Sequence, residues 1–228
     1  MRLLFDCDTI IYKGLYAVDG YYGGLRACDN IVYRVLDKWG EGWEPSFFLS
    51  GPDNFRKKIY PLYKANRVNR PQYLHDARKY FMKYWGAVFS VGLEADDMLA
   101  MNYGEDSVLV VQDKDYYQLD GATLYDPFKD VVTKIDDGAF FFFRQMLTGD
   151  KSDNIPGLKN PAKSHFKEPP NFTDVTATEL LNSKQNFKEA VQQLYKDQFG
   201  DDWQSIYDRN AQLLFLKRSL NCNYNDYY

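Results

Sequence analysis

The chain has 228 residues and a formal net charge of −4, and 45% of its residues are hydrophobic. These values fit one α/β domain, or one domain with a small appendage, and they exclude a disordered chain. No apolar run reaches the ~18 residues of a membrane-spanning helix, and an acid follows the N-terminus too early for a signal peptide. The three cysteines form no Cys-x-x-Cys pair. We therefore expect a reduced, cytoplasmic protein with no membrane partner, disulfide scaffold or zinc site.

The first part of the chain alternates predicted strands with predicted helices. Apolar runs predict strands over 2–5, 45–50, 87–91 and 107–111. Helical spacing of apolar residues predicts a helix that ends at Trp39 and another over 95–103. This alternation is typical of an α/β fold in which helices flank a mostly parallel central sheet.

The last third of the chain has a different character. From residue 139 onward no strand is predicted, and amphipathic patterns predict helices over 184–199 and 203–216, after a proline-containing loop at 159–173. We therefore expect an α/β core over 1–138 with a short basic arch at about 55–72, and a helical subdomain over 139–220. Residues 221–228 are predicted to be a loosely held tail.

Acidic residues follow three of the predicted strands, at the point where each strand ends. They are Asp6 after the first strand, Glu94, Asp96 and Asp97 after the third, and Asp113 and Asp115 after the fourth. The carboxyl ends of parallel strands line the ligand crevice of an open sheet, so these side chains are expected to converge. Converging carboxylates repel one another unless cations hold them, and a set of oxygen ligands selects Mg²⁺ or Mn²⁺.

A further acidic group, Asp150 and Asp153, opens the helical part of the chain. The spacing of three residues puts both carboxylates on one face of a turn. For any one of these aspartates a helix cap or a solvated loop is the simpler interpretation. Four acidic groups, three of them at strand ends, favour a metal site.

A basic segment without acids lies between residues 56 and 70. It contains Arg56, Lys57, Lys58, Lys64, Arg67 and Arg70, interleaved with Phe55, Tyr60 and Tyr63. Positive charge among aromatic rings suits a phosphate backbone and unstacked bases. The alternative is a solvated helix face followed by a loop.

Five short motifs occur in order between residues 3 and 157. They are LLFD at 3–6, FRK at 55–57 with YKANR at 63–67, GLEADD at 92–97, QDKDYYQL at 112–119 and TGDKSDNIPG at 148–157. In this order they resemble the 5′ nucleases of bacteriophages and bacteria, which include flap endonucleases, 5′–3′ exonucleases and phage RNase H-type enzymes.

The resemblance implies a PIN-like nuclease core over 1–138 and a DNA-binding part of helix–turn–helix type over 139–220. It implies a monomeric enzyme of replication, or of primer and flap removal, in a bacterial or phage-infected cell. Such an enzyme uses two Mg²⁺ or Mn²⁺ ions to hydrolyse phosphodiester bonds near 5′ ends and flaps of DNA. Whether it also acts on RNA in a hybrid is left open.

The resemblance also implies roles for the acids. Asp6, Glu94, Asp96 and Asp113, accompanied by Asp97, would surround the more catalytic ion. The second ion would be held by Asp115, Asp150 and Asp153, partly through water, and Asp53 would lie in the outer shell.

Among the basic and aromatic residues, Lys64 matches the lysine that meets the scissile phosphate. Arg56 and Arg67 would add charge stabilisation there, and Tyr60 or Tyr63 would stack on a frayed base. The remaining predicted nucleic-acid contacts are Lys57, Arg70, Lys159 and Lys163.

One segment departs from the family's pattern. After NIPG at 154–157 the family continues with a glycine-rich hairpin that grips duplex phosphates and often a K⁺ ion. Here the chain continues LKNPAKSH without a second glycine, and Pro161 lacks an amide N–H. Duplex anchoring and K⁺ binding therefore stay open, although Lys159 and Lys163 offer positive charge.

Two alternatives remain. The sequence FDCDT at 5–9 also fits the DxDxT opening of haloacid-dehalogenase-like phosphatases, but that scheme gives no role to Glu94, Asp113 or the basic segment. A protein that only binds DNA ends is expected to lack some of the carboxylates, and none of those expected is missing.

Overall fold

The computed structural model describes residues 1–67, 69–163 and 167–228. The chain divides into two compact units. The first, which we call the sheet unit, comprises Met1–Phe55, Asn69–Asp136 and Leu216–Leu220. The second, which we call the helical unit, comprises Arg56–Val68, Asp137–Phe215 and Asn221–Tyr228. The expected basic arch at about 55–72 is therefore divided between the two units.

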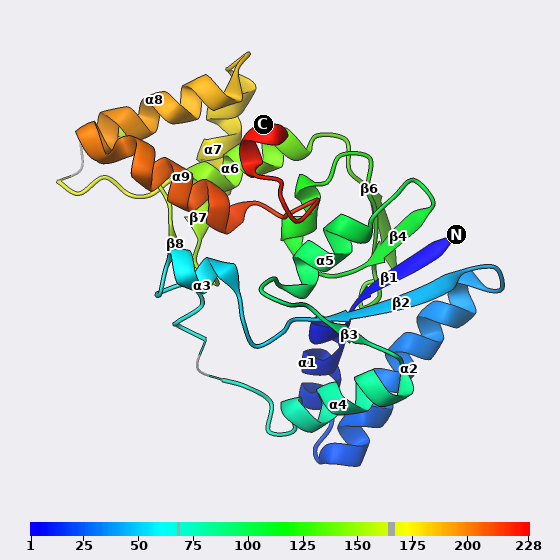
Figure 1. Ribbon diagram of the computed structural model, residues 1–228. Helices are drawn as coiled ribbons and strands as arrows, with labels where there is room; N and C mark the ends of the chain where they lie inside the picture. Colours follow the sequence, from blue (N-terminus) through cyan, green and yellow to red (C-terminus); the bar gives the residue numbers. More distant parts are fainter. Residues whose placement is uncertain (68, 164–166) are drawn as a thin grey trace. The chain divides into compact units, whose positions relative to one another are not determined.

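The sheet unit is built on a six-stranded sheet in the order β3-β2-β1-β4-β5-β6 (Figure 1). The strands are β1 (Arg2–Asp6), β2 (Glu44–Leu49), β3 (Val88–Phe89), β4 (Ser107–Val110), β5 (Thr123–Asp126) and β6 (Val131–Lys134). All neighbouring pairs are parallel except β5 and β6, which are antiparallel. The predicted mostly parallel sheet is confirmed, and its last two strands were not predicted.

Helices cover both faces of this sheet. They are α1 (Cys7–Ala17), α2 (Tyr21–Trp39), α4 (Leu74–Tyr84), α5 (Ala95–Asn102) and the 3₁₀ helix η1 (Lys114–Gln118). Leu3 and Phe5 of β1 pack into one core with α1, α2 and α4, whereas Leu4 packs into another core with α5 and η1. Successive side chains of a strand point to opposite faces, so the apolar run of β1 serves two cores.

The helical unit contains most of the remaining helices. They are α6 (Gly138–Thr148), α7 (Asp174–Asn182), α8 (Phe187–Phe199) and α9 (Trp203–Leu214), with the short η2 (Pro161–Lys163), η3 (Gly200–Asp202) and η4 (Tyr224–Asp226). The short helix α3 (Phe55–Ile59) begins at the last residue of the first sheet-unit segment. The strands β7 (Gly149–Asp150) and β8 (Ile155–Pro156) form a small hairpin. Across the described ranges, no helix combines the length and apolar character needed to cross a bilayer.

The last eight residues differ from the loosely held tail that the sequence predicts. The rings of Tyr228 and Phe142 stack with centroids 4.4 Å apart. Cys222 and Tyr224 are buried in the core of the helical unit. Burial of these side chains outweighs the freedom that a chain end would otherwise keep.

Candidate functional site

Asp6 lies at the point where β1 ends and α1 begins. Its Oδ1 accepts hydrogen bonds from the amides of Asp8 and Thr9 at 3.0 and 3.3 Å, and its Oδ2 accepts one from the Thr9 hydroxyl at 2.6 Å. The side chain therefore caps the helix and is held in one orientation. Asp6 is both the last residue of β1 and the N-cap of α1, which begins at Cys7, so no loop separates the strand from the helix.

The environment of Asp6 opposes its negative charge. Burial, followed by the charges of Asp8 and Asp113, raises the pKa of Asp6 to about 7. Asp113, which caps η1, is thus close enough to Asp6 to act on it. A carboxylate held among like charges is stabilised when a cation binds beside it.

Tyr116 connects these acids to Asp96 on α5. Its hydroxyl donates a hydrogen bond to Asp96 Oδ1 at 2.8 Å. Burial, followed by the charges of Asp96, Asp6 and Asp113, raises the pKa of Tyr116 well above its usual range. The Tyr116 hydroxyl thus contacts Asp96 and is influenced by the charges of Asp6 and Asp113, and we call these three carboxylates the acidic cluster. Sequence reasoning did not single out Tyr116.

Glu94 and Asp97 form a capping box at the start of α5. Asp97 is fully buried, its Oδ2 accepts the amide N–H of Glu94 at 3.1 Å, and its Oδ1 accepts the amide N–H of Lys217 at 3.0 Å. Both carboxylate oxygens thus receive backbone donors. This arrangement favours a structural role for Asp97 over the predicted ligand role. The spacing of Glu94 and Asp97 is the sequence signal for such a box.

The other acids of the sheet unit are placed differently. Asp8 bridges two elements, because its Oδ2 accepts the Ser50 amide at 2.8 Å and its Oδ1 accepts the Arg78 guanidinium at 2.6 Å. Asp115 is partly exposed and its amide donates to Asp113 Oδ1 at 3.1 Å. Asp53 is exposed in the loop before α3. The predicted metal-ligand role of Asp115 and the predicted outer-shell role of Asp53 stay predictions.

The donor chemistry of the acidic cluster fits a hard divalent cation, since it offers only carboxylate oxygens. As the side chains stand, however, no three His, Cys, Asp or Glu residues among those described are gathered tightly enough to hold an ion. Binding would need the carboxylates to draw together.

In the helical unit, Asp153 is surrounded by donors from the basic segment. The Tyr63 hydroxyl donates to Asp153 Oδ2 at 2.9 Å, and Lys64 Nζ lies 3.5 Å from the same oxygen. The guanidinium of Arg67 donates to Asp153 Oδ1. The structure thus brings two predicted catalytic cations together with a predicted metal ligand.

Backbone contacts dock this basic segment on the loop after β7. The Lys64 amide donates to the Asp153 carbonyl at 2.9 Å. Asn66 Nδ2 donates to the Lys151 carbonyl at 2.8 Å, and Asn154 Nδ2 donates to the Leu62 carbonyl at 2.9 Å. Residues 62–67 are therefore held as one piece with residues 151–154.

Asp150 organises the turn of that loop. It is buried, and its Oδ1 accepts the amides of Ser152 and Asp153 at 2.8 and 3.2 Å. The hairpin also needs glycine, because Gly149 has a φ of +67° and a Cβ on Gly157 would lie 2.2 Å from the Thr148 carbonyl oxygen. The TGDKSDNIPG motif therefore contains residues required by the backbone as well as candidate ligands.

Arg56 does not present its charge to solvent. It is 2% exposed, its Nε donates to the Leu213 carbonyl at 2.9 Å, and its Nη2 donates to the Phe215 carbonyl at 2.7 Å. This placement favours a structural role, in which the guanidinium joins α3 to the end of α9. A direct role at a phosphate stays a prediction.

The predicted nucleic-acid contacts differ in accessibility. Lys57, Arg70, Lys159 and Lys163 are exposed, as contacts with a phosphate backbone require. Tyr63 is 3% exposed, which does not suit stacking on a base. Tyr60 is partly exposed, and the guanidinium of Arg209 lies 5.0 Å from its ring centroid. The Lys159 amide donates to Gln198 Oε1 at 2.8 Å.

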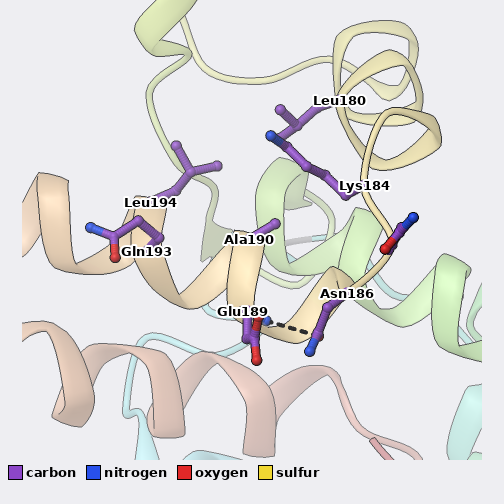
Figure 2. Close-up of a pocket in the computed structure, with 8 residues that line it drawn as sticks. Leu180, Lys184, Asn186, Glu189, Ala190, Gln193 and Leu194 are labelled. Carbon is purple, nitrogen blue, oxygen red and sulfur yellow. Dashed lines mark hydrogen bonds between the residues drawn. The ribbon is translucent and has the colours of Figure 1, made fainter.

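Two pockets lie within the helical unit. One of about 230 Å³ includes Tyr60, Lys151 and Asn154 among its lining residues, so it adjoins the docked basic segment. The other, of about 580 Å³, lies between α7 and α8 (Figure 2). Its lining includes Leu180 and Leu194 and none of the predicted site residues. The larger pocket is therefore not where the sequence places the chemistry.

The chain is similar in sequence to several known proteins and similar in fold to solved structures. No family model matches the chain. It is 26% identical to a DNA polymerase I of Caldicellulosiruptor bescii, over 96% of this chain and 28% of the polymerase. It is 27% identical to a 5′-3′ exonuclease of Buchnera aphidicola subsp. Schizaphis graminum, over 86% of this chain and 75% of the relative. The chain spans less than a third of the DNA polymerases I that it matches.

A similar solved structure is the flap endonuclease of bacteriophage T5 in complex with DNA and metal ions. The TM-score is 0.63 at 15% identity, and the match covers 95% of this chain and 88% of that one. Together, these findings confirm the predicted resemblance to 5′ nucleases and the predicted fold class.

Proposed function

We propose that this chain is a structure-specific 5′ nuclease that hydrolyses phosphodiester bonds of DNA with the help of divalent cations. The observation that carries the proposal is the acidic cluster, in which Asp96 accepts a hydrogen bond from Tyr116 and the charges of Asp6 and Asp113 act on the same hydroxyl. The relationship to a 5′-3′ exonuclease supports it. We further propose that Mg²⁺ or Mn²⁺ is the cation and that 5′ ends or flaps are the substrate.

The chain's own contribution is to hold oxygen ligands in place before substrate arrives. The N-cap of α1 fixes Asp6, and the Tyr116 hydroxyl fixes one oxygen of Asp96. Divalent cations held by such ligands would supply an activated water and would stabilise the attacking and leaving oxygens. The fixed orientation of these ligands limits the rearrangement that remains to the approach of the carboxylates toward a common ion.

The basic segment would supply positive charge to the phosphate. Lys64 and Arg67 are paired with Asp153, and a phosphate oxygen is an equally suitable acceptor for both. The exposed Lys57 and Arg70 are suited to positioning the backbone of the nucleic acid, whose contacts carry much of the affinity. Both groups belong to the segment whose aromatic and basic residues predict nucleic-acid binding.

The decisive experiment is cleavage of a 5′-labelled flap duplex in Mg²⁺ and in EDTA. The proteins compared are the wild type, Asp113→Asn and the matched control Asp136→Asn, which changes an exposed acid in the same unit. We expect fragments that depend on Mg²⁺, that Asp113→Asn no longer produces and that the control still produces. Their lengths distinguish flap cutting from exonuclease action, and a parallel RNA–DNA hybrid tests the RNA strand.

Two results would contradict the proposal. Hydrolysis of a small phosphomonoester without any cleavage of the duplex would favour the phosphatase alternative. Tight binding of flap DNA by the wild type, again without cleavage in Mg²⁺ or Mn²⁺, would favour a protein that only binds DNA ends.

A further inference from the structure

The ring of Tyr116 is locked inside the core of the sheet unit. It is 0% exposed and belongs to the core that also contains Leu4, Leu99 and Leu109. A tyrosine has only two side-chain torsions, and close packing leaves this ring in one orientation. The position of its hydroxyl is therefore set by the core rather than by the solvent-facing side of the site.

That hydroxyl lies at the acidic cluster. It donates to Asp96 Oδ1 at 2.8 Å and feels the charges of Asp6 and Asp113. Asp113 caps the same turn, η1, from which Tyr116 projects. One short turn thus supplies both a carboxylate of the cluster and the donor that fixes another carboxylate of the cluster.

We propose that Tyr116 is a positioning residue, which holds the Asp96 carboxylate in the orientation that binds a divalent cation. The proposal rests on the nuclease function proposed above. A phenylalanine or leucine would fill the same apolar space, so packing alone does not require the hydroxyl. What the hydroxyl adds is a donor directed at a carboxylate, and such outer hydrogen bonds orient metal ligands and tune their affinity.

A purely structural explanation makes a different prediction. A buried tyrosine hydroxyl needs an acceptor, and Asp96 would satisfy that need whatever its other role. In that case removal of the hydroxyl would change stability and leave cation affinity unaltered. The two explanations are separated by a measurement of cation binding to the free protein.

The test is Mn²⁺ titration of the DNA-free protein, followed by the paramagnetic resonance signal of unbound Mn²⁺. We expect Tyr116→Phe to weaken Mn²⁺ binding roughly 10-fold or more. The matched control is Tyr195→Phe, which also removes a hydroxyl from a buried ring, one that donates to the Met146 carbonyl at 2.9 Å. That control should bind Mn²⁺ like the wild type, and thermal melts should show both variants folded.

Two further readouts sharpen the test. In an Asp96→Asn background, Tyr116→Phe should have no additional effect on Mn²⁺ affinity, because the carboxylate that it positions is gone. With flap DNA, the lowered rate of Tyr116→Phe should return toward that of the wild type as the Mg²⁺ concentration rises. A variant that is merely loosened would not be rescued in this way.

Unchanged Mn²⁺ affinity in Tyr116→Phe, while Asp96→Asn loses it, would overturn the inference and leave the proposed function standing. An equal loss in Tyr195→Phe would also overturn it, since the effect would then come from general loosening. A wild type that neither binds Mn²⁺ nor cleaves flap DNA would overturn the proposed function, and the inference with it.

Discussion

Asp6 and Asp153 are both buried aspartates in acid-rich motifs, but their surroundings are opposite in charge. Around Asp6, burial and the charges of Asp8 and Asp113 raise the carboxyl pKa to about 7. Around Asp153, the Tyr63 hydroxyl, Lys64 and Arg67 all approach the carboxylate. A cation from outside the chain would stabilise the first carboxylate, whereas the second already has cations from the chain itself.

Among the predicted metal ligands, Asp6 is therefore placed to bind a cation, whereas Asp153 is placed to stabilise the fold. Removing the charge of Asp6, which burial and neighbouring carboxylates disfavour, should stabilise the fold and abolish the reaction. Neutralising an acid that holds two cations should destabilise the fold. Substitutions at the two places are therefore expected to have opposite signs in a thermal melt.

The largest effect is expected for Asp6→Asn. Cleavage should fall to background, because a ligand of the acidic cluster is lost, while the free energy of unfolding without divalent cations should rise. In the folded wild type the pKa of Asp6 lies above the ordinary value of 3.8. Below about pH 4 the carboxyl is protonated in both the folded and the unfolded protein. As the pH rises through about 7 the folded protein loses this proton, and the stability that the proton contributes is lost with it. The variant's advantage should therefore approach an upper limit of about 4 kcal/mol at pH 8 and shrink at pH 5.

Melting curves in EDTA at pH 5 and pH 8 measure this. The asparagine keeps an oxygen for the amides of Asp8 and Thr9, so the helix cap is retained. A melting temperature at pH 8 below that of the wild type would contradict the assignment of Asp6 to a buried site among like charges.

Lys64→Ala should lower single-turnover cleavage about 100-fold, with little change in affinity for flap DNA. The reason is that Lys64 would stabilise charge that develops on the phosphate. The control is Lys57→Ala, which changes an exposed lysine of α3. This substitution should lower the affinity for DNA, and the salt dependence of that affinity, more than it lowers turnover. If Lys64→Ala lost only affinity, Lys64 would be a positioning contact for the backbone.

Asp153→Asn should lower the free energy of unfolding by about 2 kcal/mol, because it removes a buried carboxylate and leaves Lys64 without that partner. Denaturant unfolding measures the change. Asp106→Asn, which disrupts an exposed pair with Arg2, is the control and should cause no measurable loss. Equal stability of Asp153→Asn and the wild type would show that the donors around Asp153 contribute little.

The smallest effect is expected for Asp97→Asn. Its amide nitrogen would face one of the two backbone donors, so stability should fall by about 1 kcal/mol, as for a weakened helix cap. Mn²⁺ affinity should stay within twofold of the wild type, in contrast to Asp96→Asn. A loss of Mn²⁺ affinity as large as that of Asp96→Asn would restore Asp97 to the predicted ligands.

The acids were predictable because parallel strands end at one edge of a sheet. Once strands were assigned at 2–5 and 107–111, Asp6 and Asp113 had to lie near each other, and their electrostatic interaction agrees with this. Helix α1 was harder to predict, because Asp6 ends β1 and caps α1 with no turn residues between them. Strands β5 and β6 are only four residues each and form a hairpin whose β6 residues are largely exposed, so their hydrophobic pattern is weak.

The roles of individual side chains were harder to predict than the position of the site. Arg56 belongs to a basic run that suggests solvent exposure, but its acceptors are carbonyls of residues 213 and 215, far away in the sequence. Tyr116 is one of 19 tyrosines, and only the fold shows that its hydroxyl reaches Asp96. Contacts of this kind depend on tertiary packing and leave no local pattern.

The short segment Leu216–Leu220 belongs to the sheet unit although it follows the helical unit's main segment in the sequence. Its Lys217 amide supplies one of the two backbone donors to Asp97, which caps the helix that carries Asp96. This donor lies 120 positions after Asp97 in the sequence. Contacts between residues so far apart are expected to form late in folding, because a long loop must close first. The start of α5, and with it the final position of Asp96, is therefore expected to be completed late.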